Sequence, residues 1–290
     1  MPVLTRNLQG AALGLAAFGL YALYDTTIKF LGSAFSPVQI LWCAGVFALP
    51  IVLAQVYLGS AKGGLHPLLP RWTLIRVACT LVNGILGAYA FSVLPLAEAY
   101  AVFFLMPLMI SALAVPMLAE PLDLPRVVAI LAGLVGVIVV LQPGQLPILP
   151  GHLAAFVSAV LGSVNYVILR KTSGVERRGV LLFWPIATQT AVLTLALPFV
   201  WVPMPPLAVG LTLMMALELV AGGLMLIAAY RLAPAIVVAP MQYSQILWAV
   251  ILGALFFGEG LNAATVIGIA IIVAAGLFLM SRTGQVARAV

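Results

Sequence analysis

Long apolar stretches divide the sequence into ten segments, each close to the length of a membrane-crossing helix. A helix needs roughly 20 apolar residues to cross a hydrocarbon core about 30 Å thick. Short connections rich in glycine and proline separate the segments, for example at Gly63–Gly64 and Pro203–Pro206. The pattern predicts an all-α integral membrane protein with ten transmembrane helices. These are Leu8–Leu31, Pro37–Leu58, Trp72–Leu94, Ala97–Leu118, Arg126–Leu141, Gly151–Arg170, Gly179–Val200, Pro206–Tyr230, Pro234–Phe257 and Asn262–Met280.

Composition supports the same class. The chain is 64% hydrophobic and only 7% charged, with a mean hydropathy of +1.24. An average soluble domain carries roughly 25% charged residues, so this chain has too few polar side chains to coat a surface in water. The net charge of +6 would suggest a nucleic-acid partner in a soluble protein. In a membrane protein it indicates basic cytoplasmic loops, so we expect a lipid bilayer and no nucleic acid as surroundings.

The positions of the basic residues predict the orientation of the chain. If the N-terminus is cytoplasmic, ten helices place twelve of the thirteen basic residues on the cytoplasmic side, and only Lys29 lies outside. The twelve are Arg6, Lys62, Arg71, Arg76, Arg126, Arg170, Lys171, Arg177, Arg178, Arg231, Arg282 and Arg288. Basic residues concentrate in cytoplasmic loops, so both termini are predicted to be cytoplasmic.

An internal repeat organises the chain. The stretches 96–144 and 232–284 both begin with Leu-Ala-x-Ala, and each contains Glu-x-Leu followed by an acid or its amide. These turns are Glu120–Asp123 and Glu259–Asn262, whose glutamates we expect to cap the helices that follow. Five segments precede Gly151 and five follow, so the second half begins on the opposite side of the membrane. The sequence therefore predicts two inverted repeats, residues 1–144 and 145–290, around a central cavity.

Polar side chains inside apolar helices are the candidate functional residues, because polar groups are costly in hydrocarbon unless they contact protein or water. Glu218 lies 12 residues beyond Pro206, roughly 18 Å along its helix and near the middle of the membrane. It is predicted to bind a substrate cation or to exchange a proton. The alternative is a protonated carboxyl group that forms a hydrogen bond between helices.

Asp25 and Lys29 are four residues apart and share one side of the first helix. They form either a structural ion pair or part of the binding site. In the second case Lys29 suits a substrate carboxylate or phosphate, Glu218 suits an ammonium group, and Asp25 is a second candidate for proton coupling. A zwitterionic amino acid satisfies both charges.

The ninth segment supplies a further group of hydrogen-bonding side chains. It contains Gln242, Tyr243, Gln245 and Trp248 within two turns, which predicts a recognition surface on the cavity. Further candidates for substrate binding come from three other segments, and these are Asn83, Tyr100, Asn165 and Tyr166.

The sequence resembles a known family. Ten segments in two copies, the Leu-Pro-Leu-Ala-x-Ala motif at 94–99, Pro107 and the helix-ending Glu120 are similar to EamA-type drug/metabolite transporters. The resemblance implies a carrier of the bacterial inner membrane that exports amino acids or related compounds by alternating access. The stretch 241–245, Met-Gln-Tyr-Ser-Gln, resembles a subgroup associated with S-adenosylmethionine, so a transporter of S-adenosylmethionine or nucleotide-like metabolites is the alternative.

Other function classes are disfavoured. The sequence contains no Gly-x-x-x-x-Gly-Lys-Ser/Thr loop for a nucleotide, and its two histidines, His66 and His152, fall on opposite sides of the membrane. A membrane-embedded enzyme or a metal site normally needs clustered His, Cys or acidic side chains. We therefore expect no enzyme activity, cofactor or metal. A channel remains an alternative. Glycines in the fifth and tenth segments predict close helix packing or a dimer surface, which is compatible with a monomer or weak homodimer.

Overall fold

The structure is a computed structural model that describes residues 2–58, 64–118, 124–141, 149–260 and 262–289. Within these ranges it is helical and contains no strand, as the apolar pattern predicts. The elements are α1 (Pro2–Gly32), α2 (Pro37–Leu58), α3 (Pro70–Val93), α4 (Leu96–Phe103), α5 (Leu105–Leu118), α6 (Leu124–Leu141), α7 (Pro150–Ser173), α8 (Arg178–Ala196), η1 (Leu197–Phe199), α9 (Pro206–Leu232), α10 (Ala235–Val238), η2 (Ala239–Ser244), α11 (Gln245–Phe257) and α12 (Ala263–Ala289).

Seven helical stretches of the described residues are long and apolar enough to cross a membrane, which confirms a multi-pass membrane protein. They are Arg6–Gly32, Pro37–Tyr57, Pro70–Val93, Glu98–Leu118, Pro150–Ser173, Arg178–Phe199 and Pro206–Leu232. The other three predicted segments contain α6, the α10–α11 region and α12. That these three also cross the membrane stays a prediction.

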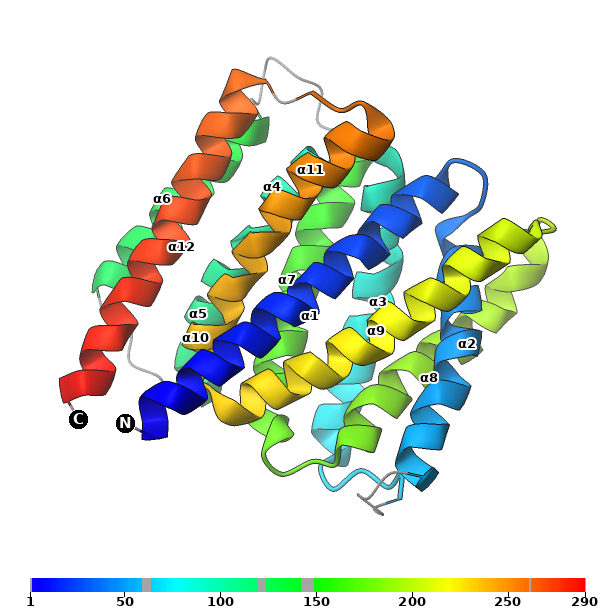
Figure 1. The fold of residues 1–290 in the computed structure, drawn as a ribbon, viewed down its shortest axis with the longest axis horizontal. Helices are drawn as coiled ribbons and strands as arrows, with labels where there is room; N and C mark the ends of the chain where they lie inside the picture. Colours follow the sequence, from blue (N-terminus) through cyan, green and yellow to red (C-terminus); the bar gives the residue numbers. More distant parts are fainter. Residues whose placement is uncertain (1, 59–63, 119–123, 142–148, 261, 290) are drawn as a thin grey trace.

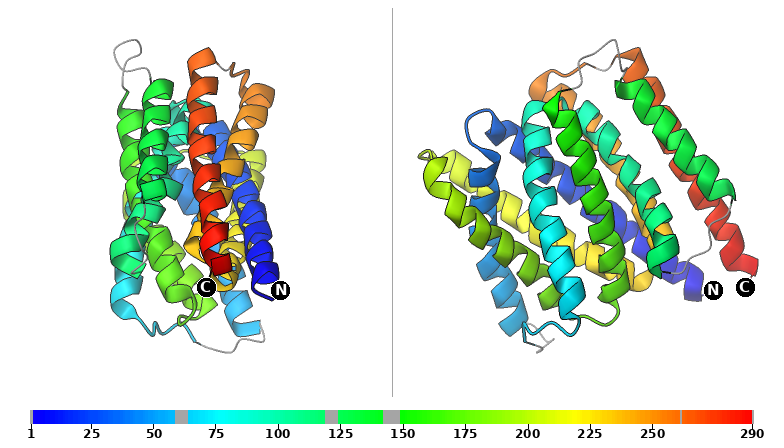
Figure 2. Two further views of the ribbon diagram at one scale, coloured as in Figure 1. Left: turned by 90° about the vertical axis from the view of Figure 1, so that its left-hand side faces the viewer. Right: turned by 180° about the vertical axis from the view of Figure 1, so that it is seen from behind.

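The helices form two layers that run the length of the bundle. The helices α12, α11, α1 and α9 lie on one broad face (Figure 1), and α6, α5, α7 and α3 lie on the opposite face (Figure 2). The closest pairs are α1 with α9, α3 with α7, α6 with α12 and α2 with α8. The start of α1 and the end of α12 lie at the same end of the bundle (Figure 1).

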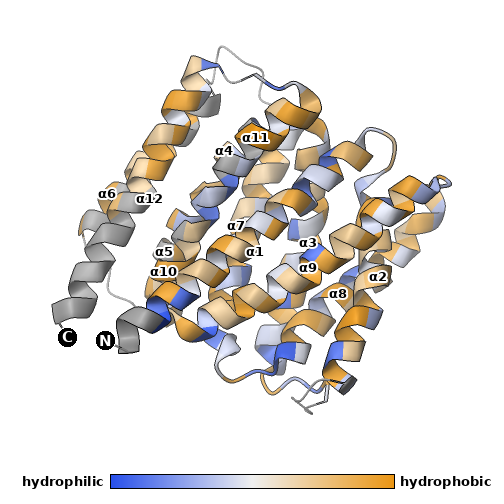
Figure 3. Ribbon diagram, viewed as in Figure 1, coloured by the Kyte–Doolittle hydropathy of each residue, from blue (hydrophilic) through white to orange (hydrophobic). Residues whose placement is uncertain are grey.

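Large apolar side chains cover the outside of the bundle. Phe199, Leu195 and Leu255 are 87%, 75% and 73% exposed. Figure 3 shows hydrophobic residues along the outward surfaces of most helices. Such a surface is unfavourable in water and favourable in lipid, because hydrocarbon offers no partner to polar groups and no penalty to apolar ones. The exposed apolar side chains therefore mark the part of the surface that contacts the bilayer.

Two segments that were predicted to be single helices are interrupted. The segment Ala97–Leu118 is divided into α4 and α5 at Phe104. Pro107 has no N–H to donate to the carbonyl of Phe103, four residues earlier, and its ring crowds that carbonyl. The helix therefore breaks where that hydrogen bond is lost.

The segment Pro234–Phe257 is also discontinuous. It begins as α10, tightens into the 3₁₀ turns of η2 and continues as α11. Residues three apart align in a 3₁₀ helix, so Gln242 and Gln245 lie on one side of this stretch. The interruption thus directs both amides to the same side, whereas side chains three residues apart in a regular α-helix point in somewhat different directions.

Helices α6 and α12 approach each other most closely at a glycine. A Cβ atom on Gly136 would lie 2.8 Å from the carbonyl oxygen of Gly268 and 2.7 Å from Ile272. Without a side chain at Gly136 the two backbones come into contact, as in other membrane helix pairs with small residues at the crossing. The predicted role of this glycine in helix packing is therefore observed within one chain.

We expect Gly136→Ala to lower the free energy of unfolding by about 1–3 kcal/mol, because the added methyl group overpacks the α6–α12 contact. Thermal unfolding of the purified protein in detergent measures the effect. Gly210→Ala is the control, since a Cβ there meets nothing within 4 Å and the change only raises helix propensity. Equal stability of the two variants would contradict the assigned contact.

Candidate functional site

A cavity of about 250 Å³ lies between the two layers of the bundle. Side chains from α1, α3, α7, α8 and α9 form most of its wall, and residues of α2, α4, α5, η2 and α11 complete it. Seven of the residues predicted from the sequence line this cavity, namely Asp25, Asn83, Tyr100, Asn165, Tyr166, Gln242 and Gln245. The tertiary structure thus brings together polar residues that are spread over more than 200 positions of the chain.

Asp25 supplies the acidic group of the wall. The hydroxyl of Tyr100 on α4 donates a hydrogen bond to Asp25 Oδ2 at 2.8 Å. Tyr100 is 2% exposed, and its ring packs against Phe91 and Phe104 at centroid distances of 5.1 and 5.9 Å. The aromatic contacts hold the tyrosine, and the tyrosine in turn holds the carboxyl group in place.

Arg76 is the most important cavity residue that was not among the candidates predicted from the sequence. It was counted among the cytoplasmic charges, yet it is 9% exposed and lines the cavity. Its Nε donates to Asn165 Oδ1 at 2.9 Å and its Nη1 donates to the Leu181 carbonyl at 2.6 Å. A sequence signal existed: Arg76, Thr80 and Asn83 recur at the four- and three-residue spacing of one helix face.

Other cavity residues were also missed as candidates. They are Tyr21, Tyr24, Thr80, Ser158 and Gln189. Ser158 donates to Asn83 Oδ1 at 2.6 Å across the α3–α7 contact. Thr80 Oγ1 and Gln242 Oε1 are buried and have no hydrogen-bond partner among the described residues. Buried polar atoms are nearly always paired in native proteins, so these two atoms are available to a bound molecule.

Four of the predicted site residues lie outside the cavity lining: Lys29, Glu218, Tyr243 and Trp248. Trp248 is 42% exposed on the outside of α11. Tyr243 is buried, and its ring lies 5.8 Å from that of Phe104. Gln242 and Gln245 are therefore the members of the ninth segment that reach the cavity.

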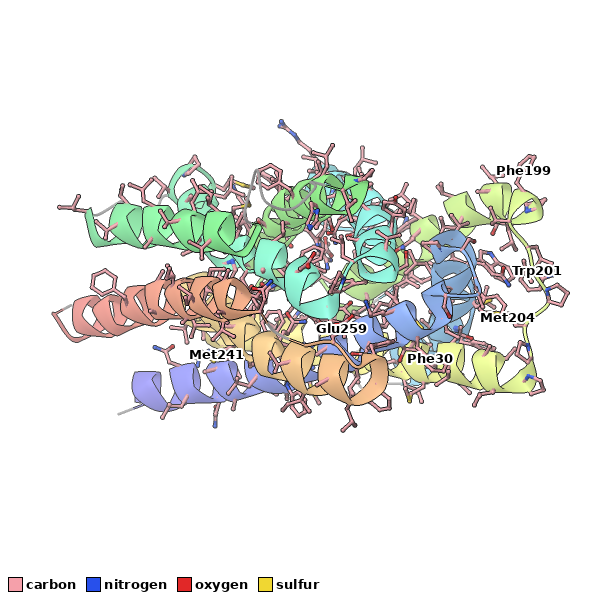
Figure 4. The ribbon with its side chains drawn as sticks, turned by 90° about the horizontal axis from the view of Figure 1, so that it is seen from above. Phe30, Phe199, Trp201, Met204, Met241 and Glu259 are labelled. Carbon is pink, nitrogen blue, oxygen red and sulfur yellow. The ribbon has the colours of Figure 1, made fainter. Side chains whose placement is uncertain are left out.

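Lys29 does not pair with Asp25, although both lie on the same side of α1. Its Nζ lies 2.8 Å from Glu259 Oε1 and donates to the Leu94 carbonyl at 2.6 Å. Glu259 was expected to cap the helix that follows it. Instead its Oε2 accepts the Leu96 N–H at 2.9 Å and caps α4, while Asn262 caps α12 through the Thr265 N–H. In the view from above, Glu259 lies between α11 and α4 (Figure 4).

Glu218 lies in the contact between α9 and α1. Gly10 is next to Ala233 and Gly222 is next to Tyr21, so the two helices run antiparallel in a register that brings Asp25 level with Glu218. The two carboxyl groups therefore lie at the same level of the α1–α9 contact. Glu218 is 6% exposed, and its Oε2 has no hydrogen-bond partner among the described residues. An acidic pair inside the membrane is an arrangement that proton relays use.

The repeated Glu120–Asp123 turn lies outside the described residues. Within the described ranges, no three side chains of His, Cys, Asp or Glu come together in a way that could hold a metal ion. His152 is in the first turn of α7, where its Nε2 lies 3.3 Å from Glu98 Oε2. The chemistry that the cavity offers is therefore hydrogen bonding, charge and aromatic contact.

Comparison with known proteins agrees with the helical membrane fold. The model of the EamA-like transporter family matches residues 8–142. A riboflavin transporter of Rhizobium johnstonii is 30% identical over 246 residues, which are 82% of this chain and 77% of that protein. An S-adenosylmethionine uptake transporter of Rickettsia prowazekii is 25% identical over 276 residues, 94% of this chain and 92% of that protein.

A solved crystal structure shares the fold. It superposes with a TM-score of 0.70 at 20% sequence identity, and the match covers 96% of this chain and 98% of the other. The family match, the similarity to named transporters over most of the sequence and the apolar helical bundle lead to one assignment. This chain belongs to the EamA-like transporter family and is a multi-pass membrane transporter.

Proposed function

We propose that the protein is an alternating-access carrier that moves a small metabolite of the amino-acid type across the bacterial inner membrane. In this proposal ten transmembrane helices form two inverted repeats, residues 1–144 and 145–290. The observation that carries the proposal is a cavity between the helix layers, lined by both polar and apolar side chains, to which both halves of the chain contribute corresponding positions. Inverted repeats around a central site are the architecture of many secondary carriers.

The spacing of the cavity residues supports the inverted repeat. Helix α1 contributes Tyr24, Asp25 and Ile28, and α7 contributes Asn165, Tyr166 and Leu169 at the same intervals. The same correspondence relates α3 to α9, and the α4–α5 break to η2 and α11. Thr80, Gly84, Gly87 and Ala88 of α3 correspond to Leu219, Gly223, Leu226 and Ile227 of α9. Phe103 and Met106, on either side of the α4–α5 break, correspond to Gln242 and Gln245.

Helix pairing supports the same symmetry. A two-fold operation that exchanges the halves converts the α1–α9 pair into the α7–α3 pair. It converts the α6–α12 and α2–α8 pairs into themselves. Discontinuous helices occur at equivalent places in both halves, next to the cavity, as in transporters that bind substrate near the middle of the membrane. The family match to residues 8–142 covers the first proposed repeat.

The substrate proposal rests on the charges and rings of the wall. The acidic Asp25 and the basic Arg76 suit a molecule that carries both charges, as an amino acid does. Resemblance to amino-acid exporters supports net export. The second candidate is S-adenosylmethionine, an amino-acid derivative with a flat adenine ring, and the names of the Rickettsia relatives favour it. The aromatic rings of Tyr21, Tyr24 and Tyr166 suit such a ring.

Proton coupling is the proposed role of Glu218 with Asp25. Both carboxyl groups lie inside membrane-spanning helices and level with each other across the α1–α9 contact, and Asp25 also borders the cavity. A proton taken up by this pair therefore changes the charge beside the substrate. That link gives a physical route from a proton gradient to substrate binding.

Polar contacts join helices at both ends of the bundle. At one end Lys29 joins α1 to Glu259 and to the α3–α4 turn through Leu94. At the other end, Arg231 on α9 donates to the carbonyl of Ser173, the last residue of α7, and to the carbonyl of Glu176, which follows α7. Alternating access requires one set to open while the other holds. We propose that the Lys29–Glu259 pair, 13% and 17% exposed, is the closure of the outer end.

We expect Lys29→Met to open the outer end, because the variant removes the cation that joins α1 to Glu259. A cysteine introduced at Phe91, which lines the cavity near that end, reports the change in a variant without Cys43 and Cys79. A membrane-impermeant maleimide added outside should label it several-fold faster than in the parent. Arg178→Met, an exposed cation at the start of α8, is the control. An unchanged rate of labelling would show that Lys29 does not hold the outer end closed.

Both termini are proposed to be cytoplasmic, which the position of both chain ends at one end of the bundle supports (Figure 1). Reporter fusions should place Gly174, between α7 and α8, in the cytoplasm, and Trp201, between α8 and α9, in the periplasm. The two connections lie at opposite ends of α8, so the reporters must disagree with each other in any transmembrane arrangement. The reversed pair of signals would overturn the proposed orientation.

A transport panel in proteoliposomes tests the function. We expect saturable flux of at least one amino acid or of S-adenosylmethionine, measured in both directions with and without a pH gradient. Riboflavin and nucleosides provide the comparison classes. Flux of riboflavin or nucleosides alone would overturn the substrate proposal, and absence of any flux from correctly folded protein would overturn the carrier proposal.

In the same liposomes, Glu218→Gln should reduce gradient-driven accumulation at least tenfold and leave substrate exchange at equal pH largely intact. The amide keeps the shape of the side chain and cannot bind the transported proton. Asp25→Asn is the companion variant, since it alters the other member of the acidic pair next to the substrate. Unchanged gradient-driven accumulation in Glu218→Gln would exclude Glu218 from proton coupling.

A further inference from the structure

We propose that Arg76 and Asn165 form the subsite that binds the carboxylate of the substrate. The inference rests on the proposed function and adds the residue that selects the anionic group. Lys29 was the candidate for this role from the sequence, but its charge is already matched by Glu259 at 2.8 Å. Among the described residues, Arg76 has no carboxylate within 4 Å, although it is buried and lines the cavity.

The hydrogen bonds of Arg76 leave part of its guanidinium group unused. The group has five N–H donors in a planar fork. One of them, on Nε, is given to Asn165 Oδ1, and one on Nη1 is given to the Leu181 carbonyl. The remaining three have no acceptor among the described residues. A buried cation with free donors is costly in a membrane unless a ligand or water satisfies it.

Asn165 adds donors to the same place. Because its Oδ1 accepts from Arg76, its NH₂ group points away from the guanidinium, and Asn165 also lines the cavity. The two side chains therefore present donors and a positive charge, and no free acceptor is directed to the ligand. An anionic oxygen pair matches this arrangement, because guanidinium groups bind carboxylates through two parallel hydrogen bonds.

The position of Arg76 breaks the symmetry of the cavity. Arg76 precedes Thr80 by four residues, and the corresponding position on α9, four before Leu219, is the fully buried Met215. Among the described residues that line the cavity, Arg76 is the one cation, so the positive charge lies on the α3 side and has no counterpart on the α9 side. Arg76 on α3 and Asp25 on α1 line the same cavity, together with the rings of Tyr21 and Tyr166. A substrate with a carboxylate at Arg76 and a cation toward Asp25 has one preferred orientation.

The alternative is that Arg76 has only a structural role. The contacts of Arg76 with Asn165 and Leu181 join α3 to α7 and α8, and their loss alone would loosen the bundle. A structural role affects all ligands alike. A carboxylate subsite affects only ligands that carry a carboxylate, so selectivity between matched ligands separates the two roles.

The experiment compares ligand pairs that differ only in the carboxylate, using the full-length protein in nanodiscs. The pairs are L-phenylalanine with 2-phenylethylamine and S-adenosylmethionine with its decarboxylated analogue. Arg76→Gln should weaken binding of the carboxylate member at least 30-fold and of its partner less than threefold. Arg76→Lys keeps the charge but loses the planar fork, and should fall between wild type and Arg76→Gln.

Arg178→Gln is the matched control and should leave the binding of both ligands of each pair unchanged. Gel filtration and thermal unfolding report whether each variant is folded, and Arg76→Lys provides a second test if Arg76→Gln is not. If Arg76→Gln weakens binding of both ligands of a pair equally, or of neither, the carboxylate subsite is overturned. The carrier proposal is not affected by that result. If wild type neither binds nor transports any carboxylate member, the amino-acid substrate proposal fails and this inference fails with it.

Discussion

A polar group inside a membrane must find its partner within the protein, and this constraint organises the structure. Lipid offers no hydrogen bonds, so each buried charge or amide is either paired or directed to a cavity. Lys29 is paired with Glu259, Ser158 with Asn83, and Asp25 with Tyr100. Among the described residues, the buried side-chain atoms without a hydrogen-bond partner are Thr80 Oγ1 and Gln242 Oε1 in the cavity wall, and Glu218 Oε2 and the hydroxyls of Tyr230 and Tyr243 outside it. Where such an atom borders the cavity, a bound molecule can supply the missing partner.

Symmetry and its interruption have separate roles. Corresponding positions of the two halves line the cavity, which suits a carrier that has to open to either side by equivalent movements. The side chains at those positions differ in chemistry, since Phe103 and Met106 of one half correspond to Gln242 and Gln245 of the other. Arg76 and Asp25 likewise have no charged counterpart. The backbone arrangement serves the movement, and the unequal side chains serve recognition.

The interrupted helices connect these two roles. Proline removes a backbone donor and can break a helix, as next to Pro107, whereas α2, α5 and α8 continue through Pro50, Pro116 and Pro185. Next to the cavity the interruption places Tyr100 against Asp25 and aligns two amides from η2 and α11. Backbone groups released by such breaks are tolerated only where protein or a cavity surrounds them. The breaks therefore belong at the site and would be unfavourable on the lipid surface.

The sequence by itself determined the membrane class, the positions of the apolar helices and most of the polar candidates, seven of which line the cavity. These follow from local composition and spacing, because transfer to lipid depends on each segment alone. Only the tertiary structure decided which charges are neutralised. Lys29 meets a carboxylate 230 positions away and leaves its neighbour Asp25 to Tyr100, and Arg76, counted from the sequence only as a charge on the cytoplasmic side, lines the cavity. Such partnerships depend on how distant helices pack, which local patterns do not contain.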